Sequence, residues 1–149
     1  MEYSGRHTYL FEKGEWRAIG TYFDENGKPV SVIGESTMNI QKKIWILEGF
    51  MELQMDKPIK MFNRYQIKPF EDDKDYTAWV SENPDLGKLN GNFIIVNDII
   101  ISQFRSENSK YSGSEMLLFI DDDQYQNWGT LFNGNDKMSS WEVMLERIS

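Results

Sequence analysis

Apolar and polar residues alternate along much of this chain with a period of two, which is the pattern of β-strands that bury one face. The clearest example spans residues 30–40, where one face carries Val30, Val32, Gly34, Ser36, Met38 and Ile40. The opposite face is polar except for Ile33. Near the C-terminus, Trp141 and Val143 alternate with Glu142 in the same way. No stretch shows a sustained helical period with caps at both ends, so the pattern predicts strands throughout.

Turn-forming residues divide the chain at regular intervals after a long first strand at residues 14–23. The predicted turns lie at Asn26-Gly27, Gln41-Lys42, Asp56-Lys57-Pro58, Asp72-Asp73-Lys74, Asn83-Pro84-Asp85, Asn97-Asp98, Asn108-Ser109, Asp121-Asp122-Asp123 and Asn133-Gly134-Asn135. Ten strands joined by short connections favour a meander that closes on itself. We therefore predict an all-β fold in a single domain over residues 1–149, a ten-stranded antiparallel up-and-down β-barrel.

Two further features fit a strongly curved barrel. Glycines interrupt the predicted strands where a tightly curved wall must bend, at Gly20, Gly34, Gly49, Gly91 and Gly129. The segments 45–53 and 93–101 are apolar on both faces. Such segments indicate that part of the outer surface is covered, that the barrel associates with itself, or that it flattens locally.

Charge and composition exclude several classes of function. The chain has 149 residues with 16 Lys and Arg against 24 Asp and Glu, a net charge of −8. An acidic surface repels nucleic acid and anionic membranes, so we expect neither as a partner. The chain has no cysteine, which excludes disulfides and thiolate chemistry. Because the N-terminus is polar and no apolar run reaches about 18 residues, we expect no signal peptide and a cytoplasmic location.

A short motif at the start of the first strand connects this pattern to a known family. Gly14-Glu15-Trp16 resembles the Gly-x-Trp of the calycin superfamily, which includes lipocalins, fatty-acid-binding proteins and ten-stranded nitrobindin-type barrels. In lipocalins a basic residue on the last strand packs over this tryptophan, and Arg147 occupies a matching position. The resemblance implies that Gly14, Trp16 and Arg147 close the barrel. It covers the whole chain as a strand pattern and three residues as a motif.

The departures from each branch of the superfamily limit what can be transferred. The signal sequence and disulfide of secreted lipocalins are missing, and residues 24–29 leave no room for the helical lid of fatty-acid-binding proteins. The nitrobindin type fits best in length and strand count, although its glycine-rich opening would have glycine in place of Ala18. Its haem is held by a histidine late in the chain, whereas the one histidine here is His7. We therefore expect no haem or other cofactor, and expect His7 to be an exposed residue leading into the first strand.

A barrel interior is a mostly apolar cavity with a few polar anchors. The alternation nominates five polar or aromatic side chains for the inner face, namely Asn63, Tyr65, Trp79, Tyr125 and Asn127. These residues either bind a ligand or satisfy one another inside a filled core.

Two charged residues flank the loop at residues 106–114 symmetrically. If this loop closes a hairpin, Arg105 and Glu115 face each other across it. Inside the barrel, Arg105 would bind a ligand carboxylate. On the outside, the pair would be a surface rung contributing ~0–1 kcal/mol. The acidic stretches 71–75 and 121–123 fit solvated turns better than a calcium loop, so we expect no metal site.

Three functions remain open. The first is binding of a small apolar or aromatic molecule, with or without an acidic group, inside the barrel. The second is a lyase or isomerase that uses Glu48 or Glu115 with Tyr65 or Tyr125 as the acid–base pair. The third is a structural barrel that pairs with itself, for example as a homodimer. An interior cavity above ~300 Å³ would favour the first two over the third.

Overall fold

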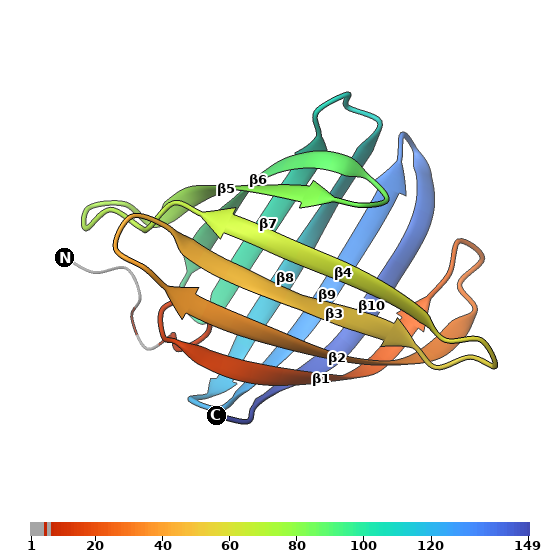
Figure 1. The fold of residues 1–149 in the computed structure, drawn as a ribbon, viewed down its shortest axis with the longest axis horizontal. Helices are drawn as coiled ribbons and strands as arrows, with labels where there is room; N and C mark the ends of the chain where they lie inside the picture. Colours follow the sequence, from red (N-terminus) through yellow and green to blue (C-terminus); the bar gives the residue numbers. More distant parts are fainter. Residues whose placement is uncertain (1–4, 6) are drawn as a thin grey trace.

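The computed structural model describes Gly5 and residues 7–149, and these form an all-β barrel (Figure 1). The ten strands are β1 (Gly14–Phe23), β2 (Pro29–Ile40), β3 (Trp45–Leu53), β4 (Ile59–Ile67), β5 (Tyr76–Asn83), β6 (Gly87–Val96), β7 (Ile99–Ser106), β8 (Tyr111–Asp121), β9 (Gln124–Asn133) and β10 (Asp136–Arg147). Within the described part of the chain, no helix could cross a membrane. Most of the polar N-terminus, for which we expect no signal peptide, lies outside the described residues.

Each predicted turn falls at or between the ends of two consecutive strands. Four of these turns are stabilised by a hydrogen bond to an Asp or Asn side chain. Asp and Asn oxygens accept the backbone N–H two residues further on, which stabilises the turn. These contacts run from Asn26 to Asp24, from Asp85 to Asn83, from Lys110 to Asn108 and from Asp123 to Asp121, at 2.8–3.0 Å.

The sheet closes because β1 pairs with both β2 and β10. Every neighbouring pair is antiparallel, and the strands follow one another around the barrel in chain order. The predicted ten-stranded up-and-down barrel is therefore confirmed. Trp16 lies opposite Arg147 on β10 and opposite Ser36 on β2, so the motif at the start of the first strand lies at the seam of the barrel.

Glycine lets neighbouring strands approach closely at two positions in the wall. A Cβ at Gly49 of β3 would overlap the backbone carbonyl oxygen of Glu35 on β2. A Cβ at Gly129 of β9 would overlap the indole of Trp141 on β10, which fills the space that the glycine leaves. These two glycines therefore serve packing, as a sharply curved sheet requires.

One end of the barrel is closed by the residues that precede β1. Tyr9 and Leu10 are buried among the inward side chains of the strands, at the end where β1 begins and β10 ends (lower left in Figure 1). His7 is only 4% exposed. The expectation of an exposed His7 is therefore wrong, because residues 7–13 fold into the barrel end before they enter β1.

The opposite end, called the mouth below, is less tightly filled. Five inward side chains there are only partly buried, namely Tyr22, Val30, Met51, Met61 and Phe104, whereas Leu53 and Leu89 at the same end are buried. The wall is also incomplete near the mouth. β4 pairs with β3 from Ile59 to Ile67 but with β5 only from Tyr65 to Ile67. The first half of β4 therefore has a free edge beside the turn that joins β5 to β6 (Figure 1).

Candidate functional site

Glu115 of β8 is an ionisable side chain in the middle of the barrel. It alternates with the buried Leu117, which places it on the inner face. In the adjoining strands it lies opposite Ser102 and Gly129. Burial raises the pKa of Glu115 to about 7. The Trp141 indole N–H lowers that pKa because it stabilises the carboxylate, although its Nε1 forms no full hydrogen bond within 3.5 Å.

Two tyrosines share the interior with this carboxyl group. Burial, with a smaller contribution from the Glu115 charge, raises the pKa of Tyr65 well above its usual value. Burial also raises the pKa of Tyr9; the Ser36 hydroxyl opposes the shift and Glu115 adds to it. Both phenols therefore stay protonated at neutral pH, so they can donate hydrogen bonds but cannot act as bases.

These groups face a small cavity of ≈ 80 Å³. Its lining includes four of the residues nominated from the sequence, Asn63, Tyr65, Glu115 and Asn127. The volume holds a few water molecules and is smaller than the ~300 Å³ at which pockets for drug-sized ligands begin. The barrel is therefore largely filled, and by cavity size alone the structural barrel is favoured over the two functions that need a ligand. A larger guest has to displace side chains. Met51 lines this cavity, and its flexible thioether side chain adapts readily to a new neighbour.

Trp79 and Asn127 have structural partners of their own. The Trp79 indole is 2% exposed and donates to the Ser102 hydroxyl at 3.3 Å. Its ring meets Tyr65 edge to face, with centroids 4.7 Å apart. The Asn127 amide donates to the backbone carbonyl of Met116 at 3.2 Å. Both residues help to build the walls around Glu115.

The predicted pairing of Arg105 with Glu115 is wrong. Arg105 lies opposite Ser112, and Glu115 lies opposite Ser102. The reason is that β8 already begins at Tyr111, so part of the stretch assigned to the loop continues the ladder. Arg105 is exposed on the outer face, and it therefore cannot anchor a ligand inside.

Glu48 is also excluded as an interior acid–base residue. Its carboxylate lies on the outer face, 3.5 Å from the Arg64 guanidinium, and about half of its side chain is exposed. Its register partner Arg64 shares that outer face, so the pair is a surface ion pair of small energetic value.

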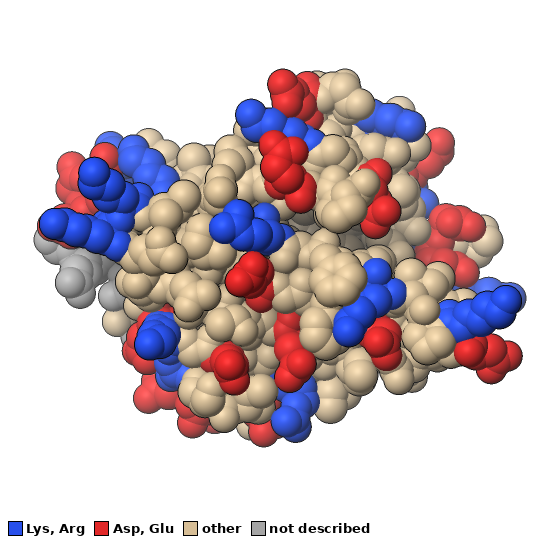
Figure 2. Space-filling model, in the orientation of Figure 1, with Lys and Arg blue, Asp and Glu red and all other residues tan. Residues whose placement is uncertain are grey.

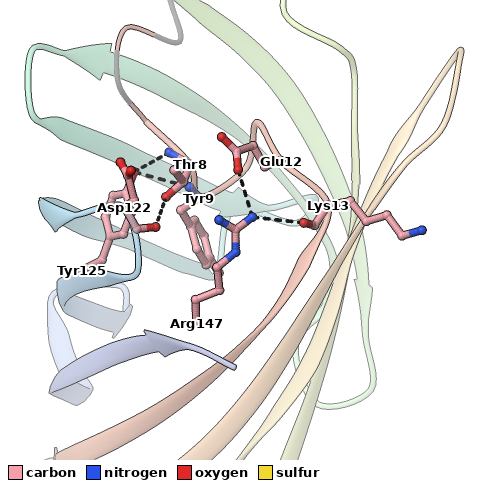
Figure 3. Close-up of polar contacts among 7 residues, drawn as sticks. All are labelled: Thr8, Tyr9, Glu12, Lys13, Asp122, Tyr125 and Arg147. Carbon is pink, nitrogen blue, oxygen red and sulfur yellow. Dashed lines mark hydrogen bonds and ion pairs between the residues drawn. The ribbon is translucent and has the colours of Figure 1, made fainter. Parts of the chain in front are cut away.

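Tyr125 binds the segment that closes the barrel. Its hydroxyl accepts the backbone N–H groups of Thr8 and Tyr9 at 3.2 and 3.4 Å (Figure 3). His7 Nδ1 lies 2.8 Å from the same oxygen, and His7 Nε2 lies 2.7 Å from the Asn97 carbonyl. Because a carbonyl only accepts, Nε2 carries the proton, and the Tyr125 hydroxyl donates to Nδ1. All hydrogen-bonding positions of this hydroxyl are thus used within the closed end.

Arg147 lies over the Trp16 ring, with its guanidinium carbon 5.6 Å from the ring centroid. Nη2 of Arg147 donates to the Glu12 carboxylate at 3.0 Å and to the Lys13 carbonyl at 3.2 Å (Figure 3). A Cβ at Gly14 would lie 3.2 Å from Nε of Arg147, so glycine leaves room for this stack. The contacts join the last strand to the closing segment.

Sequence reasoning missed Tyr9, Ser102 and the partners of His7. Ser102 could have been found, since it alternates with two apolar residues on its strand. Tyr9 lies before the first strand, where a period of two carries no information. Its only signal is an apolar run, Tyr9-Leu10-Phe11, near an otherwise polar terminus. Among the described residues, no group of three or more His, Cys, Asp or Glu side chains could hold a metal ion.

No family model and no curated protein matches the sequence. Solved structures do match in shape. The S-type phycobiliprotein lyase CPES from Guillardia theta is 10% identical, with a TM-score of 0.66 over 91% of this chain and 88% of that chain. Rv2717c from M. tuberculosis is 13% identical, with a TM-score of 0.65 over 91% of this chain and 92% of that chain. At these identities the similarity establishes the fold alone, and the chain shares with these two proteins the fold of a closed ten-stranded β-barrel.

Proposed function

We propose that the barrel binds a small, largely apolar or aromatic molecule whose hydrogen-bond-donating or cationic group reaches Glu115. The observation that supports this proposal is a carboxyl group of raised pKa facing an interior cavity. Burial of such a group costs free energy, which an apolar side chain in a purely structural core would avoid. A role in ligand binding would explain why a carboxyl group is kept in the interior despite that cost.

The polarity of the interior favours a ligand that donates a hydrogen bond over a ligand that carries a carboxylate. Glu115 faces the cavity, and no Lys or Arg lines it. The suggestion of an acidic ligand depended on an inward Arg105, and that residue lies outside. A ligand carboxylate would meet a like charge, whereas an amine, a ring N–H or a hydroxyl would meet an acceptor.

The size of the interior suggests how such a ligand fits. The polar end occupies the cavity beside Glu115, and the apolar body lies in the mouth among Tyr22, Met51 and Met61. The methionine side chains move aside to make room. Thioether and aromatic groups provide an apolar contact surface without strict shape selection.

Three probes of matched size test the proposal: benzylamine, benzyl alcohol and benzoate. Binding is followed through the methyl resonances of Met51 and Met61 by NMR at pH 8. We expect benzylamine to bind more tightly than benzyl alcohol, and benzoate to bind most weakly. In Glu115→Gln the preference for the amine is lost. Equal binding of all three probes, or no binding of any, would contradict the proposal.

A second candidate function is proton transfer, because a pKa of about 7 lets Glu115 both accept and release a proton at neutral pH. Tyr65 would serve as the neutral hydrogen-bond donor. One of the similar structures is named a lyase, so the barrel fold is compatible with such chemistry. The test is deuterium uptake from D₂O into C–H positions of bound carbonyl compounds. Uptake that depends on Glu115 supports the reaction, and its absence leaves binding as the function.

A further inference from the structure

The outer face of β5 to β9 carries a groove that is separate from the interior cavity. It has a volume of ≈ 810 Å³ and crosses all five strands. Along this stretch β6, β7 and β8 are each hydrogen-bonded to a neighbouring strand on both sides, so no strand edge is free to pair with another chain. A ligand in this groove is therefore recognised by side chains rather than by main-chain groups.

Uncharged polar side chains dominate the lining of this groove. Their amide and hydroxyl groups come from four adjacent strands, namely from Asn90, Asn92, Gln103, Ser112, Ser114 and Thr130. Four of these residues form one row across the sheet, since Asn92 lies opposite Gln103, Gln103 opposite Ser114 and Ser114 opposite Thr130. The Ser114 and Thr130 hydroxyls are hydrogen-bonded to each other at 3.1 Å. Amides and hydroxyls both donate and accept hydrogen bonds, which suits a ligand that carries many hydroxyl groups.

The charge of this groove differs from that of the wall formed by β2, β3 and β4. On that wall, acidic and basic side chains are intermingled (Figure 2). The described lining of the groove contains no carboxylate and one cation, Arg105. Arg105 is exposed and forms no ion pair with any described residue. The charged residues at the adjoining strand ends are two acids and two bases, Glu82, Glu107, Lys88 and Lys110. Arg105 is therefore available to a carboxylate of a ligand.

An exposed tryptophan borders the groove. Ser114 and Thr130 also line an adjoining hollow of ≈ 480 Å³, whose lining includes Met116 and Trp128. Trp128 is 36% exposed, and its indole N–H donates to the Glu142 carboxylate at 2.7 Å. This hydrogen bond restricts the orientation of the ring. An exposed aromatic face held in this way packs well against the C–H face of a sugar ring.

Arg105 and Trp128 lie at opposite ends of this surface. Trp128 shares a row with Met116 and with Ile101 of β7, and Arg105 lies further along β7. From strand spacing and rise, the two residues are about 16 Å apart. A ligand that contacts both is therefore longer than a single sugar ring.

From this geometry we propose that the outer face of β7, β8 and β9 binds a short oligosaccharide that carries one carboxylate. The carboxylate pairs with Arg105, and a sugar ring stacks on Trp128. The row of amide and hydroxyl groups between them binds the sugar hydroxyls. The interior carboxyl of Glu115 takes no part in this site.

Two other occupants fit this surface less well. A ligand with many negative charges would be repelled by a protein whose net charge is −8. A second copy of this chain would cover Trp128, but it would also bury the amide and hydroxyl row. Burial of polar groups costs free energy unless each of them is paired.

The test uses the full-length protein and three saccharides. Glucuronosyl-xylobiose carries one carboxylate, xylotriose is a neutral trisaccharide of matched length, and glucuronate is a single acidic ring. Binding is followed by NMR through the side-chain amides of Asn90, Asn92 and Gln103 and the indole N–H of Trp128. We expect the acidic trisaccharide to bind about twofold to fivefold more tightly than xylotriose, as one exposed ion pair allows, and glucuronate to bind most weakly.

Variants of the protein separate this site from general attraction. Arg105→Gln should give the two trisaccharides equal affinity, and Trp128→Ala should weaken both by the same factor. The matched control Arg17→Gln, at an exposed position on β1, should change neither affinity. The methyl resonances of Met51 and Met61, which report on the barrel interior, should not shift.

Four results would overturn the proposal. The first is no binding of either trisaccharide, and the second is binding of glucuronate as tight as that of the acidic trisaccharide. The third is a preference for the acidic trisaccharide that survives in Arg105→Gln. The fourth is a Trp128 resonance that shifts with protein concentration before sugar is added, because a second copy would then occupy this face.

Discussion

At the scale of single residues, Glu115 combines a cost in stability with a capacity for recognition. Its carboxyl lies among tyrosine, serine and tryptophan side chains beside the small interior cavity, and the residue as a whole is partly buried. An interior carboxyl group is easily explained as a ligand-binding group and poorly explained as part of a packed core. Replacement of Glu115 by glutamine should therefore raise stability and weaken ligand binding.

The first prediction concerns how the stability cost of burying Glu115 depends on pH. Because the pKa of Glu115 rises from 4.5 in the unfolded chain to about 7 in the fold, the folded state holds the proton more tightly. Stability is therefore lost as pH rises from about 4.5 through 7, by about 3 kcal/mol. Glu115→Gln removes this loss, so the variant should be more stable than wild type at pH 8 and similar at pH 4. Urea denaturation at both pH values measures the difference, and a variant that is less stable at pH 8 would refute it.

The second prediction concerns the closed end. Tyr125→Phe removes the oxygen that accepts from Thr8 and Tyr9 and that binds His7. Buried groups without partners cost about 1–3 kcal/mol each, so we expect a loss of about 2–3 kcal/mol in unfolding free energy. Hydrogen exchange of the Thr8 and Tyr9 amides should speed up. Tyr76→Phe, at an exposed position, is the control and should change neither quantity.

The residues also show where sequence reasoning succeeds and fails. The period of two placed Asn63, Tyr65 and Asn127 on the inner face correctly, because a strand offers its side chains only two directions. It left the face of Arg105 open, and the expected pairing of Arg105 with Glu115 was wrong because the register of a hairpin depends on where its turn begins. The turn here is tighter than the polar stretch 106–114 suggested.

At the scale of elements, the strands and turns were predictable because both depend on local chemistry. Asp and Asn oxygens make the turns after β1, β5, β7 and β8. The incomplete pairing of β4 with β5 was not predictable, because the extent to which two strands pair is a tertiary feature that the residue pattern of one strand does not encode. The same holds for residues 7–13, whose place is fixed by contacts with distant strands.

The third prediction concerns the packing between β9 and β10. In Gly129→Ala the new methyl group would overlap the Trp141 indole, so the ring must move. Overpacking of this kind costs about 1–3 kcal/mol. Because Trp141 borders Glu115, the tryptophan emission should also change in wavelength. Gln103→Ala, an exposed substitution on β7, should alter neither stability nor emission.

At the scale of the whole molecule, side chains largely fill the barrel, which is closed at one end and less tightly packed at its mouth. Its fold follows from the alternation, the turns and the glycines, whereas the contents of its interior depend on tertiary packing. The outer surface also carries exposed apolar side chains on β6, β8 and β9, among them Val96, Met116 and Trp128. Val96 belongs to the segment 93–101, which the sequence showed to be apolar on both faces, and Met116 lies opposite Ile101 of that segment and opposite Trp128. Self-association through this surface stays a prediction.

The fourth prediction tests that association. If the outer apolar face pairs two copies, sedimentation of the wild-type protein should depend on concentration. Met116→Lys, at an exposed position on β8, should then give a monomer at every concentration. A wild-type protein that remains monomeric would remove the homodimer from consideration.

The central claim is that the barrel holds a small molecule through Glu115. Native mass spectrometry of the wild-type protein and of Glu115→Gln, both purified from the protein's own host, tests it most directly. We predict an additional mass on the wild-type protein, belonging to a molecule with an amine, ring N–H or hydroxyl group, and no such mass on the variant. Bare protein in both samples, or the same adduct on both, would contradict the claim.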